Sequence, residues 1–166
     1  MRVGPADLCV RLKGEVSDDY IRIIPRDPDF VPDEVRRQNA VSFFRTIAPQ
    51  ADEIRSSVSE NVTFIDCAEN FERVCCPSCG AELSVHAWQK WLDEDFDGEG
   101  FAFSQHAMPC CVARHLLHEL TYEWPQGFAR SKVWAMNPNI GKLTDNQCSR
   151  FEQLLGCPVR VIYQHI

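Results

Sequence analysis

Residues 76–80 read Cys-Pro-Ser-Cys-Gly, and this stretch decides how the rest of the chain is interpreted. Two cysteines separated by two residues can direct both thiolates at one tetrahedral metal ion, because the turn between them points the sulfurs inward. Pro77 preorganises that turn, and Gly80 permits the left-handed conformation that often follows it. The stretch therefore predicts half of a metal site.

A second cysteine pair lies further along, at Pro109-Cys110-Cys111. The pairing of two such clusters is typical of a zinc ribbon, so the predicted ligands are Cys76, Cys79, Cys110 and Cys111. Adjacent residues of an extended chain point to opposite sides, so both Cys110 and Cys111 can bind one ion only where the backbone turns. Pro109 favours such a turn. If one of the two points away, four side chains remain as the fourth ligand: Cys75, His86, His106 and His115.

Other interpretations of these cysteines stay open. Free cysteine is among the most buried residue types, so the thiols could be unligated core residues. An iron–sulfur cluster needs the same four thiolates, although the proline-glycine turn favours zinc. Cys76 and Cys79 could also form a redox pair, but a helix capped at Ser84 begins too late to lower a thiol pKa. Four thiolates fill the zinc coordination shell, which favours a structural ion.

The composition suits one folded domain. The chain has 166 residues, of which 45% are hydrophobic and 25% charged. No run approaches the roughly 18 apolar residues of a membrane helix, and the opening MRVGPADLCV lacks the apolar core of a signal peptide. These features predict a cytoplasmic protein without a membrane segment, in which nine cysteines point to metal or redox chemistry rather than disulfides.

The net charge of −7 indicates which class of macromolecule the chain could bind. Affinity for nucleic acid that is independent of base sequence needs dense Lys and Arg, and here 17 basic residues stand against 24 acidic ones. Another protein, in particular a basic one, fits this balance better. A nucleic-acid contact would need a basic patch, and the semi-clustered candidates Arg11, Lys13, Arg22 and Arg26 are explained by a solvated strand face.

Hydrophobic patterns predict an α+β fold with mixed small sheets, helices and a zinc-ribbon-like lobe. Strands are predicted at residues 7–13, 20–24, 62–65, 101–108, 120–124, 128–136 and 159–163. Helices are predicted at residues 32–48 and 51–58, after the cap Ser84, and from the cap Thr144 to Gly156. Gln147 completes a capping box with Thr144.

The domain organisation follows from these elements. One domain is predicted over residues 1–166, with residues 67–118 as the zinc-ribbon-like lobe and residues 119–166 as a ββαβ unit. Its first two strands form a hairpin through Pro125-Gln126-Gly127, which would bring Glu123 near Arg130. His115 and His118 lie three residues apart, where a solvated turn is the default and a second metal site the alternative.

Several of these motifs together resemble a group of uncharacterised bacterial proteins. The motifs are residues 76–80, 109–111, 122–130, 137–141 and 155–157. The resemblance implies a bacterial, cytoplasmic protein and supports the metal site, but it implies no activity. Some members carry a transport-ATPase label, which this chain contradicts, because Met136 stands five residues before Gly141 and Leu143 follows Lys142, so no phosphate-binding loop is formed.

The function predicted from the sequence is a non-enzymatic protein-interaction module, either an adaptor or immunity-like. In it, structural zinc would hold a lobe too small to bury its own core. The alternative is a zinc- or thiol-dependent enzyme that acts on a small molecule. No residue is assigned a catalytic role. A deaminase is excluded, because His86 is followed by Ala87 and Trp88 where that motif requires a glutamate.

Overall fold

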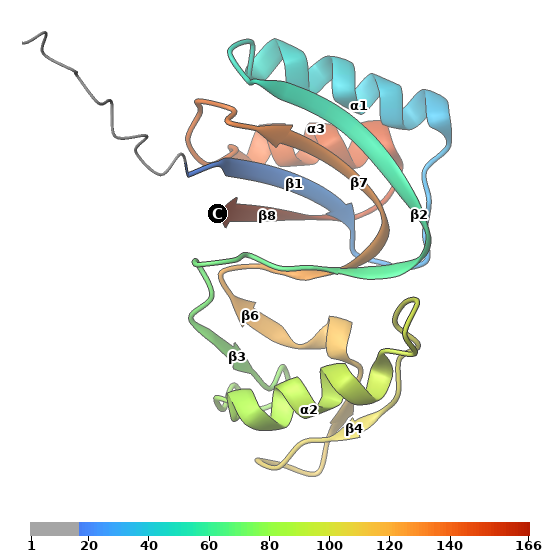
Figure 1. Ribbon diagram of the computed structural model, residues 1–166, viewed down its shortest axis with the longest axis vertical. Coiled ribbons are helices and arrows are strands. Elements are labelled where there is room, and N and C mark those ends of the chain that lie inside the picture. The colour runs from blue at the N-terminus through green and yellow to red at the C-terminus, as the bar shows by residue number, and fades with distance from the viewer. Residues whose placement is uncertain (1–16) are drawn as a thin grey trace, which may run out of the picture.

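The fold, described for residues 17–166 by a computed structural model, consists of two stacked layers (Figure 1). The first layer is a four-stranded sheet with two helices on one face. The second layer contains one α-helix and several short strands. The α+β class predicted from the sequence is therefore confirmed. The strand predicted at residues 7–13 lies outside the described part of the chain.

The sheet of the first layer is antiparallel throughout, with the strand order β2-β7-β1-β8. Its strands are β1 (Asp19–Pro25), β2 (Glu53–Ile65), β7 (Gly127–Met136) and β8 (Val159–His165). From Ala129 onward, buried and half-buried residues alternate along β7, because successive side chains of a strand point to opposite faces. The strands predicted at residues 20–24 and 159–163 are confirmed as β1 and β8.

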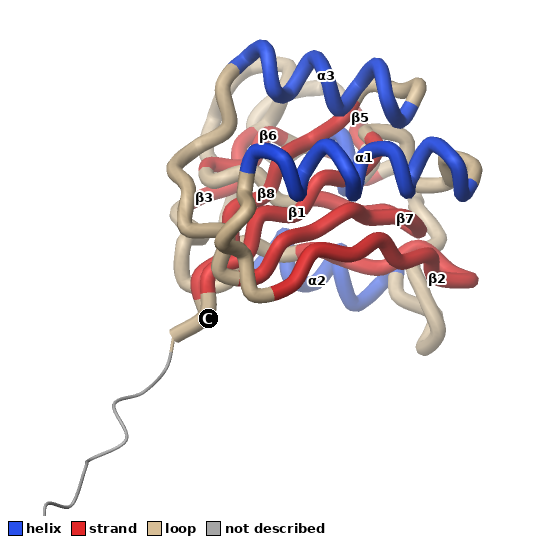
Figure 2. The backbone as a smooth tube through the Cα atoms, turned by 90° about the horizontal axis from the view of Figure 1, so that it is seen from above, coloured by secondary structure: helices blue, strands red, loops and turns tan. Residues whose placement is uncertain are grey.

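Two helices, α1 (Glu34–Ile47) and α3 (Asp145–Leu155), cover one face of this sheet (Figure 2). The helix α1 starts after Asp33, whose side chain accepts a hydrogen bond from the Arg36 N–H at 2.9 Å, rather than at Pro32. The helix α3 has the predicted capping box of Thr144 and Gln147 and ends at Gly156 in the left-handed conformation. The core between helices and sheet includes Ile23, Phe44, Val133, Ala135 and Phe151.

Within the segment predicted as a second helix, residues 51–58, residues 53–58 are instead part of the long strand β2. Its residues pair with β7 as far as Val58, and after a register shift the pairing resumes at Thr63. Pairing with a distant strand here outweighs local helix propensity. The strand predicted at residues 62–65 is correct and forms the end of β2.

The predicted hairpin of residues 120–136 is also wrong. The strand β6 (Thr121–Glu123) pairs with β3 (Arg73–Cys75) in the second layer, whereas β7 pairs with β1 and β2. The chain therefore crosses from one layer to the other at residues 124–126. Glu123 consequently forms its ion pair with Arg73, and the Arg130 Nε donates to the Ser59 carbonyl at 3.3 Å.

The second layer contains α2 (Val85–Asp95), β3, β6, the short strands β4 (His106–Ala107) and β5 (Arg114–His115), and a 3-10 helix at Leu117–Glu119. The strand predicted at residues 101–108 is thus reduced to two residues. Trp88 lies at the centre of this layer, where its Nε1 donates to the Tyr122 hydroxyl at 3.2 Å. The core of this layer includes Val74, Leu83, Trp88, Leu117, Tyr122 and Phe128.

This second core includes residues from both predicted subregions, 67–118 and 119–166, and from the sheet itself through Phe128 of β7. Two layers thus share the strand β7. The division of the chain at residue 118 stays a prediction. In residues 17–166, no helix is both long enough and apolar enough to cross a bilayer.

The strand β8 lies at one edge of the sheet, and residues 68–70 cover its C-terminal end. Ala68 forms a bridge with His165, and the Glu69 N–H donates to the His165 carbonyl at 3.4 Å. The Asn70 side-chain amide donates to the Tyr163 carbonyl at 3.0 Å. These bonds satisfy outward-facing carbonyls that an edge strand would otherwise expose.

The core of the first layer predicts how strongly α3 contributes to stability. Phe151 is fully buried and packs edge-on against Phe43 and Phe44, with ring centroids 5.0 and 5.2 Å away. The substitution Phe151→Ala is expected to lower the free energy of unfolding by about 3–5 kcal/mol, because it leaves a cavity. Urea unfolding measures this loss. The exposed residue Gln153 on the same helix gives the control Gln153→Ala, and equal midpoints for the two variants would contradict the packing described.

Candidate metal centre

The first cysteine pair lies in a turn that closes a small hairpin. The Cys76 N–H donates to the Ala81 carbonyl and the Gly80 N–H donates to the Cys76 carbonyl, both at 2.9 Å. One step further out, the Leu83 N–H donates to the Val74 carbonyl at 2.8 Å. Gly80 has a φ of +74°, the left-handed conformation expected of it. The turn geometry predicted for residues 76–80 is therefore present.

The second cysteine pair lies at the tip of another hairpin. Its strands β4 and β5 are antiparallel, and the Met108 N–H donates to the Ala113 carbonyl at 3.0 Å, which encloses residues 109–112 in the turn. This turn breaks the extended geometry in which adjacent side chains diverge. Cys110 and Cys111 can therefore both point toward the first hairpin.

The four predicted cysteines converge, with all sulfurs within 4.8 Å of one another. The Sγ atoms of Cys76 and Cys111 are 3.7 Å apart, and those of Cys79 and Cys110 are 3.3 Å apart. In a tetrahedral site with Zn–S bonds of about 2.3 Å, sulfurs are separated by about 3.8 Å. The group therefore has the size and chemistry to hold a metal ion.

The charge on these sulfurs depends on the protein around them. Burial raises the pKa of Cys76, but the backbone N–H groups of Cys79 and Ser78 stabilise its thiolate and bring the pKa to about 6. The pKa of Cys110 is instead raised to about 12, first by its hydrogen bond with Cys79, then by burial and by the neighbouring Cys76 thiolate. Without a cation, one thiolate thus opposes the ionisation of a neighbouring thiol. A bound cation would reverse this effect, since it favours the thiolate form of every ligand.

The side chains considered as alternative fourth ligands lie outside the group of four cysteines. His106 lies against Asp95, with 3.1 Å between Nε2 and Oδ2, and its ring stacks on Trp91. His86 is exposed on α2, and Cys75 lies in the strand β3. Over residues 17–166, the one group with metal-binding geometry contains the four cysteines alone.

A polar chain that the sequence did not predict joins the two hairpins. The Ser78 hydroxyl lies 2.7 Å from His115 Nε2, and His115 Nδ1 lies 3.5 Å from Glu119 Oε2. The same Glu119 oxygen accepts the Leu116 N–H at 2.8 Å. The chain therefore fixes the first turn against the strand that follows the second. The position of Ser78 between two ligand cysteines was the available signal, but its partner is distant in sequence.

His118 does not join His115 in a second metal site. Its ring contacts Phe103 edge-on at 4.7 Å, and burial lowers its pKa. The two histidines therefore have separate partners, and His118 is half-buried rather than part of a solvated turn.

A buried polar contact anchors the β4–β5 hairpin to α2. Asp95 is 2% exposed, and its carboxylate accepts the Ser104 N–H at 3.2 Å as well as contacting His106. The burial of Asp95 depends on partners from a hairpin that local sequence does not predict.

Comparisons with protein-family models, with curated proteins and with solved structures give no match to this chain. Its function is therefore inferred from the fold and from the cysteine group.

The cysteine geometry predicts specific metal retention. Protein purified without chelators is expected to contain close to one equivalent of metal, measured by inductively coupled plasma mass spectrometry. The substitution Cys79→Ser should abolish retention, because it removes one of the ligands. Cys148 lies on α3, outside the group, so Cys148→Ser is the matched control and should keep the metal. A wild-type protein without bound metal would contradict the site.

Proposed function

We propose that this chain is a non-enzymatic protein-interaction module, either an adaptor or immunity-like, with one structural zinc ion held by Cys76, Cys79, Cys110 and Cys111. The observation that carries the proposal is the convergence of four sulfurs from two hairpin tips at spacings close to those of a tetrahedral thiolate site. Two hairpin tips that share one ion are the arrangement of a zinc ribbon, which we assign to the lobe around residues 67–118.

Several observations favour a structural ion over a catalytic one. Four thiolates complete the coordination shell and leave no position for a reactive water. The strands next to the ligands are two or three residues long, so hydrogen bonding in the strands contributes little to the stability of the hairpins. A metal ion would supply the missing stability. The chain Ser78–His115–Glu119 adds contacts that orient the ligand turns.

Zinc is favoured over iron by the first turn. Four thiolates accept either zinc or an iron–sulfur cluster. The sulfur spacing matches a single small ion, and the Pro77 and Gly80 turn is the geometry expected for a zinc-binding hairpin. Metal analysis of the purified protein distinguishes zinc from iron. Visible absorption gives a second test, since an iron–sulfur cluster absorbs visible light and zinc does not.

The charge balance supports a protein partner that is basic. The chain carries 24 acidic and 17 basic residues, so its field attracts basic surfaces. Arg22, one of the residues that could form a basic patch, already has partners within the protein. It packs on Tyr20 and donates to the Gln164 side chain at 2.8 Å. Nucleic acid is therefore disfavoured. A bacterial, cytoplasmic setting remains part of the proposal.

The alternative is an enzyme that uses a zinc-bound water or a reactive thiol. The lowered pKa of Cys76 is the observation that favours it, because the thiolate is the nucleophilic form of cysteine. However, Cys76 is 1% exposed, which leaves a substrate little access to its sulfur. We therefore favour the structural role.

Metal removal separates the two functions. Chelation should loosen the second layer, because the ligand hairpins lose their common contact, while the first layer keeps its own core. Hydrogen exchange is expected to accelerate at the amides of Cys76, Gly80 and Met108 and to stay slow at Ile23 and Val133. Unchanged exchange at the hairpins would argue for a metal that does not support the fold. The Cys79→Ser variant provides the comparison without a chelator.

Affinity capture tests the interaction itself. The full chain, immobilised with its metal, is expected to retain a basic protein from a bacterial lysate and to release it as salt is raised from 0.1 to 0.5 M, about the range over which charge attraction is screened. A metal-free Cys79→Ser bait should retain less. Retention of nucleic acid, or turnover of an added metabolite, would contradict a protein-binding role.

A further inference from the structure

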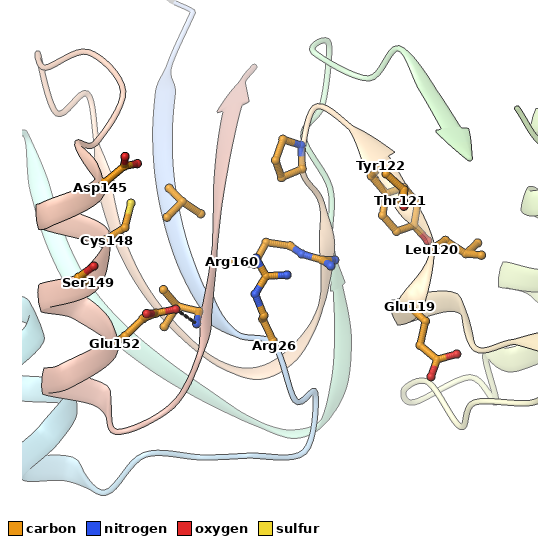
Figure 3. Close-up of a pocket in the computed structure, with 13 residues that line it drawn as sticks. Arg26, Glu119, Leu120, Thr121, Tyr122, Asp145, Cys148, Ser149, Glu152 and Arg160 are labelled. Atoms are coloured by element: carbon orange, nitrogen blue, oxygen red, sulfur yellow. Dashed lines mark hydrogen bonds between the residues drawn. The ribbon is translucent and has the colours of Figure 1, made fainter. Parts of the chain in front are cut away.

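A cavity of about 600 Å³ lies along the open part of the edge strand β8 (Figure 3). One wall is formed by α3, through Cys148, Ser149 and Glu152, and the other by residues 119–122 of the second layer. The cavity is therefore built from both layers. Its volume falls in the range of small-molecule sites.

Two arginines occupy the middle of this cavity. Arg160 projects from β8 toward the second layer, and Arg26 follows the end of β1 (Figure 3). The pKa of Arg160 is lowered first by burial and then by the positive charge of Arg26, so the two guanidinium groups are close enough to repel each other. Within residues 17–166, neither arginine takes part in an ion pair.

Of the three carboxylates that line the cavity, those of Glu119 and Glu152 accept backbone N–H groups, and Asp145 lies in the first turn of α3. Glu152 accepts the Val159 N–H at 3.1 Å, and Glu119 accepts the Leu116 N–H at 2.8 Å. Each satisfies a backbone donor at a turn or strand end and so has a structural reason for its position. The two arginines therefore leave a positive centre that these acids do not neutralise through direct contact.

Arg160 is held in place before any ligand binds. Its Nη1 donates to the Gln126 carbonyl at 2.7 Å, and its side chain lies across Gly127. A Cβ atom at Gly127 would stand 3.0 Å from Ile24 Cδ1 and 3.1 Å from Arg160 Nη1, a tighter approach than most side chains accept. Glycine at this position therefore allows Arg160 to lie against the backbone. A fixed guanidinium loses little entropy when it binds a ligand.

We propose that this cavity binds the oxyanion group of a small molecule, a carboxylate or a phosphate, between the guanidinium groups of Arg26 and Arg160. The planar guanidinium fork matches both oxyanions, and binding removes the repulsion between the two arginines. Thr121 and Ser149 offer hydroxyl groups on opposite walls for the remainder of the ligand (Figure 3). The site goes beyond the metal-supported interaction role and needs no metal ligand.

Calorimetric titration of the full, metal-loaded chain tests this site. Sodium phosphate and sodium citrate are the probes, each added at constant ionic strength in chloride buffer. At least one is expected to bind saturably. Tighter binding of phosphate would identify a phosphorylated ligand, and tighter binding of citrate would identify a carboxylate ligand.

Arginine variants decide whether the cavity is responsible. The substitution Arg26→Gln should weaken binding about ten-fold or more, because it removes a charge-assisted contact. Arg26 is exposed, and within the described chain its side chain makes no hydrogen bond, so the variant should fold. Arg160→Lys keeps the charge without the planar fork and should also weaken binding. The control Arg45→Gln, at an exposed position on α1, should bind within about two-fold of the wild type.

Two results would overturn the site: neither anion binds saturably, or Arg26→Gln binds as tightly as Arg45→Gln. The metal content of each variant is measured in parallel. Absence of anion binding with metal retained would contradict the arginine cavity and leave the proposed zinc site standing. Absence of metal from every protein would contradict the proposed zinc site and leave the arginine cavity standing.

Discussion

Four sulfurs lie within 4.8 Å of one another at the tips of two hairpins, and they set the main electrostatic constraint on the second layer. Negative charge cannot accumulate on such a group without a cation, as the opposite pKa shifts of Cys76 and Cys110 illustrate. The short strands next to these tips cannot compensate for the repulsion. The polar chain from Ser78 to Glu119 and the buried contact of Asp95 with His106 then position the hairpins around this constraint.

The two layers are joined by a strand as well as by packing. The strand β7 pairs with β1 and β2, and its residue Phe128 enters the core of the second layer beside Phe64 and Phe101. One face of the sheet therefore supports α1 and α3, and the other supports the layer that carries the cysteines (Figure 1). This arrangement brings α3 and β6 to opposite sides of β8 and so creates the arginine cavity between them.

Features encoded by neighbouring residues could be predicted from the sequence. The helix α3 follows from Thr144, Gln147 and Gly156, and the cysteine group follows from two short motifs. Features that depend on distant partners could not. Residues 53–58 form a strand because β7 is available to pair with them, and Glu123 meets Arg73 because β6 joins β3. The contact of Ser78 with His115 likewise requires both hairpins to be in place. The predicted ligands are found together, while the residues that orient them come from the fold.

The segment that covers the end of β8 affects how the protein behaves when its cysteines are oxidised. Residues 68–70 shield this edge, and they stand just before β3, in the connection that leads toward the cysteines. Anything that separates the two cysteine hairpins would also loosen the segment that masks the carbonyls of Tyr163 and His165. An uncovered edge strand is a template for pairing with another copy. Oxidation of the thiols would then be visible first as self-association, before the helical layer unfolds.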